Sequence, residues 1–115
     1  MKKLFALTVL ISILLFVGIA QAATPTWFTG TVKSVYPLAD GRYVIIFNED
    51  SPSCDGTPGN KYHYVGIGEN GVTADAAKYY FSTALTALTT GKPLSINFDA
   101  DSSGCFINRM YISAN

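Results

Sequence analysis

Apolar and polar side chains alternate most regularly between residues 93 and 100. Successive side chains of a β-strand point to opposite faces, so this period of two predicts a strand with one buried and one exposed face. The residues expected to point inward are Leu94, Ile96 and Phe98, and those expected to point outward are Ser95, Asn97 and Asp99.

Four other segments are rich in β-branched and aromatic residues and are bounded by turn residues, which is typical of strands. They span residues 27–36, 42–48, 61–67 and 105–113. In the first of them, Val32 and Val35 are out of phase with a period of two, which predicts a bulge or bend near residues 33–34. The pair Asp40-Gly41 predicts a hairpin turn between the first two strands.

Residues 73–90 form the segment with a helical period. Thr73 is suited to cap the start of this helix, and Gly91 is suited to end it before Pro93. The apolar stripe expected to face the core consists of Ala77, Phe81, Ala84, Leu85 and Leu88. The many threonines have low helix propensity, so we expect packing to hold the helix in place.

The order of these elements predicts the fold class. Three strands, one helix and two further strands match the five-stranded Greek-key barrel known as the OB-fold. We therefore expect an all-β domain with one helix, closed into such a barrel.

Cys54 and Cys105 are the two cysteines of the chain. In the OB-fold the third and fifth strands lie side by side and run parallel. Cys54 precedes the third predicted strand and Cys105 opens the fifth, so both are expected at one end of the barrel. An even count in an exported small domain also favours a disulfide between them, the alternative being two buried free thiols.

Residues 1–22 have the features of a secretory signal. A basic start at Lys2 and Lys3 precedes an apolar run that is shorter than the ~20 residues of a bilayer span, and Ala20-Gln21-Ala22 matches a cleavage site. We expect a signal peptide over residues 1–22 and a single domain over residues 23–115. The mature protein is expected to be secreted or periplasmic, with no membrane span.

Charge and composition exclude several functions. Removing the signal takes two lysines from a chain with 8 basic and 8 acidic residues, which leaves a formal charge of −2. Nucleic-acid binding needs a basic face, so it is not expected here. One histidine and two cysteines do not make a zinc site of the usual composition, and we predict neither a metal nor a cofactor.

His63 is the single histidine of the chain, and no nucleophile elbow of the Gly-x-Ser-x-Gly type is present. Acyl transfer of the serine–histidine kind needs a nucleophile, a base and an orienting carboxylate within reach of one another. We interpret His63 as a strand residue that faces solvent, and we predict that the protein is not an enzyme.

Residues 77–82 (AKYYFS) and 89–96 (TTGKPLSI) resemble the helix and following strand of the B subunits of subtilase cytotoxin and typhoid toxin. The chain also resembles short exported proteins of Gram-negative bacteria without assigned function, through Ser53-Cys54, residues 91–93 (GKP) and Gly104-Cys105. The first resemblance implies an exported OB-fold that forms pentameric rings and binds sialylated glycans. Unlike those subunits, this sequence has no long hairpin after the fourth strand and no second cysteine pair.

Exposed aromatic side chains on barrel faces stack on sugars or bases. The candidate ligand-binding residues are therefore Trp27, Arg42, Tyr62 and Tyr64. The alternative is that such aromatic residues form core or a subunit interface. We predict a non-enzymatic binding module for a glycan or a protein partner, with a homo-oligomer left open. The alternative function is a structural or inhibitory envelope protein without a small-molecule ligand.

Residues 99–104 (DADSSG) place oxygen ligands and a glycine as the start of a calcium loop does, but Met110 stands where a bidentate glutamate is needed. Pairing of the cysteines would bring Glu49, Asp50 and Asp55 to the same end of the barrel. Calcium binding and a solvated acidic rim are both left open at this point.

Overall fold

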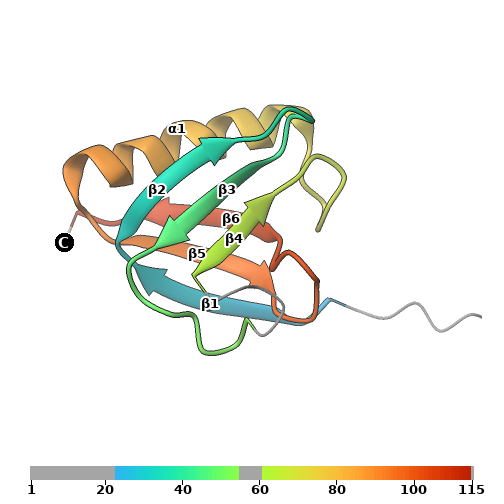
Figure 1. The fold of residues 1–115 in the computed structure, drawn as a ribbon, viewed down its shortest axis with the longest axis horizontal. Coiled ribbons are helices and arrows are strands. Elements are labelled where there is room, and N and C mark those ends of the chain that lie inside the picture. The colour runs from blue at the N-terminus through green and yellow to red at the C-terminus, as the bar shows by residue number, and fades with distance from the viewer. Residues whose placement is uncertain (1–22, 55–60, 115) are drawn as a thin grey trace, which may run out of the picture.

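The computed structural model describes residues 23–54 and 61–114, which form a mostly β structure with one helix and two three-stranded antiparallel sheets (Figure 1). One sheet has the order β1-β5-β6, and the other has the order β2-β3-β4. The strands of the first sheet are β1 (Pro25–Gly30), β5 (Leu94–Asp99) and β6 (Ile107–Ile112). Those of the second are β2 (Val32–Pro37), β3 (Tyr43–Phe47) and β4 (Tyr62–Val65).

The first predicted strand is divided between the two sheets at Thr31. The backbone N–H of Thr31 donates to Glu49 Oε2 at 2.8 Å, and its hydroxyl donates to Glu49 Oε1 at 2.7 Å. The hydroxyl bond holds the pKa of Glu49 below its ordinary value. Pairing with β3 then shifts register between Val32 and Ser34, which confirms the predicted bulge. This joint lets two consecutive strands belong to different sheets.

The core lies between the inner faces of the two sheets. The ring of Phe28 in β1 is 5.1 Å from that of Phe47 in β3, and the ring of His63 in β4 is 4.5 Å from that of Phe98 in β5. Leu94, Ile96 and Phe98 are fully buried, as the alternation of β5 predicts. Ser95 and Asn97 lie on the outer face, as predicted, but they are only 7% and 4% exposed. Neighbouring side chains cover them because β5 is the central strand of its sheet, flanked by β1 and β6.

Helix α1 (Ala74–Thr90) lies beside the edges of both sheets (Figure 1) and contacts their edge strands β2 and β6. The predicted cap is confirmed, because Thr73 Oγ1 accepts from the backbone N–H of Ala76 at 3.1 Å. Gly91 ends the helix with φ of 72°, a left-handed conformation that glycine adopts without strain.

The buried stripe of α1 differs from the predicted one. Ala77 and Ala84 are buried as expected, but Leu85 and Leu88 are exposed and Ala87 is buried instead. Two tyrosine hydroxyls fix the position of the helix. The hydroxyl of Tyr43 in β3 donates to the carbonyl of Ala77 in the helix at 2.7 Å. The hydroxyl of Tyr80 in the helix donates to the carbonyl of Asn108 in β6 at 2.6 Å. The small alanine face lets the helix approach the sheets, so the large leucines face away.

The predicted disulfide is present between Cys54 and Cys105, with their Cα atoms 6.0 Å apart. It joins the loop after β3 to the segment before β6. The backbone N–H of Tyr64 in β4 also donates to the carbonyl of Gly104 at 3.1 Å, next to this disulfide. The third predicted strand and the start of the fifth therefore lie side by side, although the strands form two sheets and not a closed five-stranded barrel.

The predicted signal over residues 1–22 lies outside the described residues. Within the part of the chain that the structure covers, no helix is long and apolar enough to cross a membrane.

Candidate functional site

The four predicted ligand-binding residues fall on two separate surfaces. Trp27 lies on the outer face of the sheet β1-β5-β6, whereas Tyr62 and Tyr64 lie on β4 in the other sheet. Arg42 directly precedes β3, the central strand of that second sheet. The structure therefore does not bring Trp27 together with the other three candidates.

Trp27 belongs to a surface made by two rows of cross-strand neighbours. Trp27 pairs with Asn97, which pairs with Arg109, and Thr29 pairs with Ser95, which pairs with Tyr111. We call this surface the tryptophan face, and its residues are Trp27, Thr29, Ser95, Asn97, Arg109 and Tyr111. Successive side chains of a strand point to opposite faces, and the residues that alternate with these six point into the core. All six side chains therefore lie on the outer side of the sheet.

Two aromatic rings and one cation form the exposed part of the tryptophan face. The ring of Trp27 meets that of Tyr111 edge-on at 5.7 Å, and the guanidinium carbon of Arg109 is 5.2 Å from the centre of the Trp27 ring. Trp27 is nevertheless 51% exposed and Tyr111 is 50% exposed. Since β1 and β6 flank β5, the rings meet above the central strand, and their packing fixes a platform that stays open to a ligand.

A polar cleft of about 240 Å³ adjoins this platform. Its lining residues are Ala23, Pro25, Asn70, Asn97, Asn108 and Arg109. Two of the amides are held in place, because Asn70 Nδ2 donates to the carbonyl of Phe106 at 2.9 Å and Asn108 Nδ2 donates to the carbonyl of Asn70 at 2.7 Å. The register of β5 and β6 shifts between Asn97 and Phe98, and this irregularity brings Asn108 to the cleft.

The amide of Asn97 differs from the other two. Asn97 as a whole is only 4% exposed, but its amide is not among the buried polar groups without a partner and lies open to the cleft. Its side chain forms no hydrogen bond with residues 23–54 and 61–114. The cleft therefore presents an unpaired donor and acceptor to whatever enters it.

No acidic side chain among the described residues pairs with Arg109. The ion pairs within the described residues are Arg42 with Asp40 and Lys61 with Asp50. Arg109 contacts the Trp27 ring and keeps its guanidinium donors free for a ligand at the edge of the cleft.

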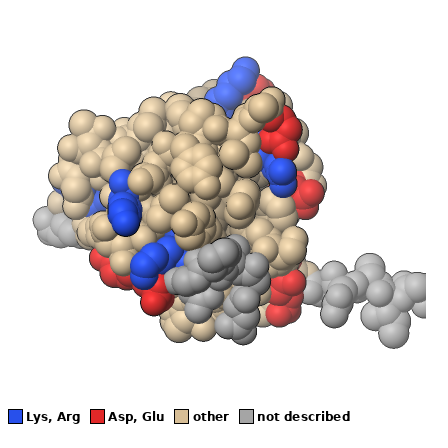
Figure 2. Space-filling model, in the orientation of Figure 1, with Lys and Arg blue, Asp and Glu red and all other residues tan. Residues whose placement is uncertain are grey.

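The other candidates lie on a second surface with different properties. Tyr36 pairs with Val44 and Val44 with Tyr64, while Ile46 pairs with Tyr62 in the next row. We call this surface, formed by Tyr36, Val44, Ile46, Tyr62 and Tyr64, the tyrosine face. The view of β2, β3 and β4 in Figure 2 shows few charges except at the margins. Tyr62 and Tyr64 are half-buried, and Val44 beneath them is fully buried.

Arg42 is engaged at the edge of the tyrosine face. Its Nε donates to Asp40 Oδ2 at 2.7 Å. The backbone N–H of Arg42, which bonds the same carboxylate, and then its side chain hold the pKa of Asp40 below the ordinary value. Arg42 therefore stabilises its own hairpin turn.

His63 is fully buried, so the prediction that it faces solvent is wrong. It packs among Phe28, Phe47 and Phe98, with ring centres 6.0, 5.5 and 4.5 Å away. Neither ring nitrogen has a hydrogen bond within the described residues. Burial lowers the pKa of His63 to about 4, and the nearby backbone of Cys105 opposes this lowering only in part. The apolar Val65, two residues on, was the signal that this phase of β4 faces inward.

The carboxylates considered for calcium have other partners. Asp99 Oδ1 accepts from the backbone N–H groups of Thr24 and Asp101 at 3.0 and 3.1 Å. Glu49 holds Thr31, and Asp50 pairs with Lys61. Within the described ranges, no three metal-binding side chains are grouped; Asp55 lies outside those ranges.

Sequence reasoning found Trp27 but missed Asn97, Arg109 and Tyr111. Arg109 and Tyr111 share one phase of the last predicted strand, and Asn97 shares the polar phase of residues 93–100. The missing information was the pairing register, which no local pattern contains. No protein-family model matches the chain, and no curated protein matches it at a significant level.

Proposed function

We propose that the protein is an exported, non-enzymatic glycan-binding module that holds its ligand on the tryptophan face. The observation that carries this proposal is the amide of Asn97, open to the cleft and without a hydrogen bond to the described residues, beside the exposed rings of Trp27 and Tyr111. An apolar partner would leave this amide unpaired, whereas a ligand with hydroxyl groups would satisfy both its donor and its acceptor.

A sugar ring matches the whole surface. Its C–H face packs on an aromatic side chain, and its hydroxyls both donate and accept hydrogen bonds, as the amide of Asn97 and the donors of Arg109 require. The platform is pre-organised by the Trp27–Tyr111 and Trp27–Arg109 contacts, which reduces the entropy lost on binding. The resemblance to toxin B subunits, which bind glycans, agrees with this assignment.

The export and barrel predictions belong to the same proposal. A disulfide between Cys54 and Cys105 is expected in an oxidising compartment, which supports a secreted or periplasmic protein. We interpret β1 and β2 as one bent strand of an OB-fold whose sheets approach each other at the Tyr64–Gly104 hydrogen bond. The position of α1 between β4 and β5, after the third strand of the OB-fold so counted, supports that interpretation.

The tyrosine face favours a second candidate function. A largely uncharged surface with half-exposed tyrosines is suited to contact another protein (Figure 2), or a second copy of the chain. On this alternative, the protein is a structural or inhibitory envelope component without a small-molecule ligand.

A glycan array probed with the full-length protein, recovered after export, tests the proposal. Trp27→Ala removes the stacking surface and Asn97→Leu replaces the amide with an apolar group of similar shape. Each is expected to weaken binding about tenfold or more, because each removes roughly 1–3 kcal/mol of ligand contact. Tyr79→Ala is the matched control, since Tyr79 is a 73% exposed aromatic residue on α1 that belongs to neither the tryptophan face nor the cleft lining.

The Asn97→Leu variant separates a binding role from a structural one. Because the amide of Asn97 forms no hydrogen bond within the described residues, its removal should leave the melting temperature nearly unchanged while glycan binding falls. A protein that binds no array glycan, or one whose binding survives both Trp27→Ala and Asn97→Leu, would contradict the proposal.

A further inference from the structure

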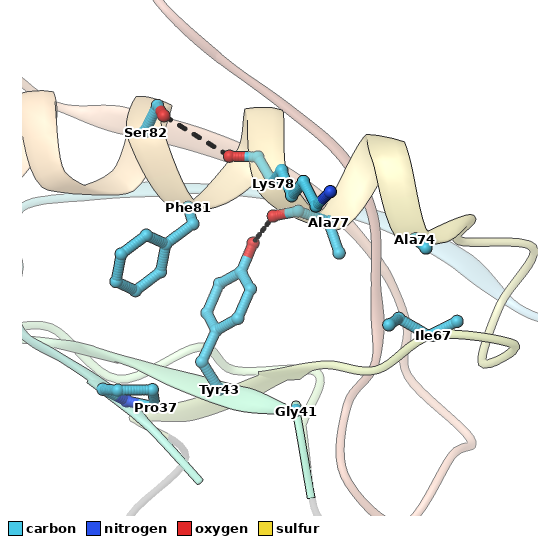
Figure 3. Close-up of a pocket in the computed structure, with 9 residues that line it drawn as sticks. All are labelled: Pro37, Gly41, Tyr43, Ile67, Ala74, Ala77, Lys78, Phe81 and Ser82. Atoms are coloured by element: carbon cyan, nitrogen blue, oxygen red, sulfur yellow. Dashed lines mark hydrogen bonds between the residues drawn. The ribbon is translucent and has the colours of Figure 1, made fainter.

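A second cavity lies between the first half of α1 and the turn that joins β2 to β3 (Figure 3). Its volume is about 490 Å³, and its main walls are Pro37, Tyr43, Ile67, Ala77 and Phe81, with Lys78 on the helix side. This size is within the ~300–1,000 Å³ of ligand pockets. The tryptophan face contributes no residue to it.

The interior of this cavity is hydrocarbon, and its polar atoms are already satisfied. The Tyr43 hydroxyl donates to the carbonyl of Ala77 at 2.7 Å, and the Ser82 hydroxyl donates to that of Lys78 at 3.4 Å, as Figure 3 shows. The ring of Phe81 packs on that of Tyr43 at 5.1 Å. A sugar or nucleotide would bury hydroxyls here without partners, whereas an alkyl chain would lose nothing.

Lys78 provides the only charged side chain among the described residues that line the cavity. No carboxylate within the described part of the chain pairs with it. The turn opposite carries Asp40 and Arg42, but these two neutralise each other through a contact of 2.7 Å. Asp75 lies in the first helical turn without lining the cavity. The cavity therefore combines an apolar interior with one uncompensated positive charge.

We propose that this cavity binds a single-chain fatty acid, with the alkyl chain against Tyr43 and Phe81 and the carboxylate at Lys78. The apolar walls select a hydrocarbon chain, and the single cation selects a headgroup of one negative charge. Lys78 lies in the second turn of α1 and lines the helix side of the cavity. Ile67, 56% exposed at the opposite wall, gives the chain additional apolar surface.

The test is isothermal calorimetry of the full-length exported protein with octanoate, decanoate and dodecanoate below their micelle concentrations. Affinity is expected to rise about two- to fourfold per added methylene, since the chain is buried in a partly open cavity. Dodecanoate is expected to bind more tightly than dodecanol and than dodecyltrimethylammonium.

Lys78→Met keeps most of the side-chain stem and removes the charge. It is expected to weaken dodecanoate about two- to fivefold, as a partly exposed ion pair would, and to leave dodecanol unchanged. Lys92→Met is the matched control, because Lys92 follows the far end of α1. Amide NMR spectra should place the shifts at residues 74–82 and at the β2–β3 turn.

Three results would overturn this assignment. They are absence of dodecanoate binding, equal binding of dodecanol and dodecanoate, and equal effects of the two lysine substitutions. Capture of an apolar peptide with no fatty-acid binding would likewise overturn it. Because Asn97→Leu is expected to retain dodecanoate binding, failure of the glycan proposal and failure of this one are distinguishable.

Discussion

Replacing both cysteines, as Cys54→Ala with Cys105→Ala, is expected to lower the free energy of unfolding by about 4 kcal/mol. The bond closes a loop with a sequence separation of 51, so its loss frees much of the unfolded chain. It also joins the loop after β3 to the segment before β6, next to the Tyr64–Gly104 hydrogen bond between them. Urea denaturation of the oxidised protein and of the double variant measures the difference.

Reduction of the wild-type protein provides an independent route to the same quantity. Dithiothreitol should move the urea midpoint of the wild type to that of the double variant and leave the variant itself unchanged. Ser53→Ala is the matched control, because Ser53 is an exposed neighbour of Cys54. A double variant within about 1 kcal/mol of the wild type would show that the disulfide does not hold the sheets together.

Acidification is expected to destabilise the protein through His63. Burial among phenylalanines lowers its pKa to about 4 in the folded state, against about 6.5 when unfolded. Between these values the unfolded chain binds more protons, so stability falls as the pH is lowered from about 6.5 to about 4. The total loss is about 3 kcal/mol, complete once both states are protonated.

His63→Leu isolates this effect from the carboxylates. Both ring nitrogens lack partners, so the variant should be at least as stable as the wild type at pH 7 and should lose clearly less stability than the wild type between pH 6.5 and 4. Asp40 and Glu49, whose pKa values are lowered, should contribute equally in both proteins. Urea titrations at pH 7, 5.5 and 4 measure the comparison, and parallel pH profiles for the two proteins would refute the role of His63.

Local patterns predicted the elements of this fold well where a pattern has one physical cause. The cap at Thr73, the stop at Gly91 and the bulge near residues 33–34 follow from backbone chemistry and were confirmed. The pairing of Cys54 with Cys105 followed from the element order and was also confirmed. The cap, the stop and the bulge need little knowledge of distant parts of the chain, whereas the cysteine pairing needed the order of all the elements.

Predictions failed where exposure depends on neighbouring elements. His63 and Asn97 are polar in sequence but buried, since His63 lies between the two sheets and Asn97 lies on a central strand. Leu88 is apolar but exposed, because α1 approaches the sheets through its alanines. The candidate site was likewise only partly predictable. Trp27 was identified by residue type, whereas its neighbours Asn97 and Arg109 emerge only from the register of three strands.

Trp27 is the single tryptophan of the chain, so its fluorescence reports directly on the tryptophan face. Titration with the strongest array glycan should shift the emission to shorter wavelength and protect the ring from acrylamide quenching. Both changes should saturate with the Kd that calorimetry gives for the same glycan, and Asn97→Leu should need about tenfold or more glycan to reach the same change. Calorimetric binding that leaves the emission and the quenching of Trp27 unchanged would contradict the account.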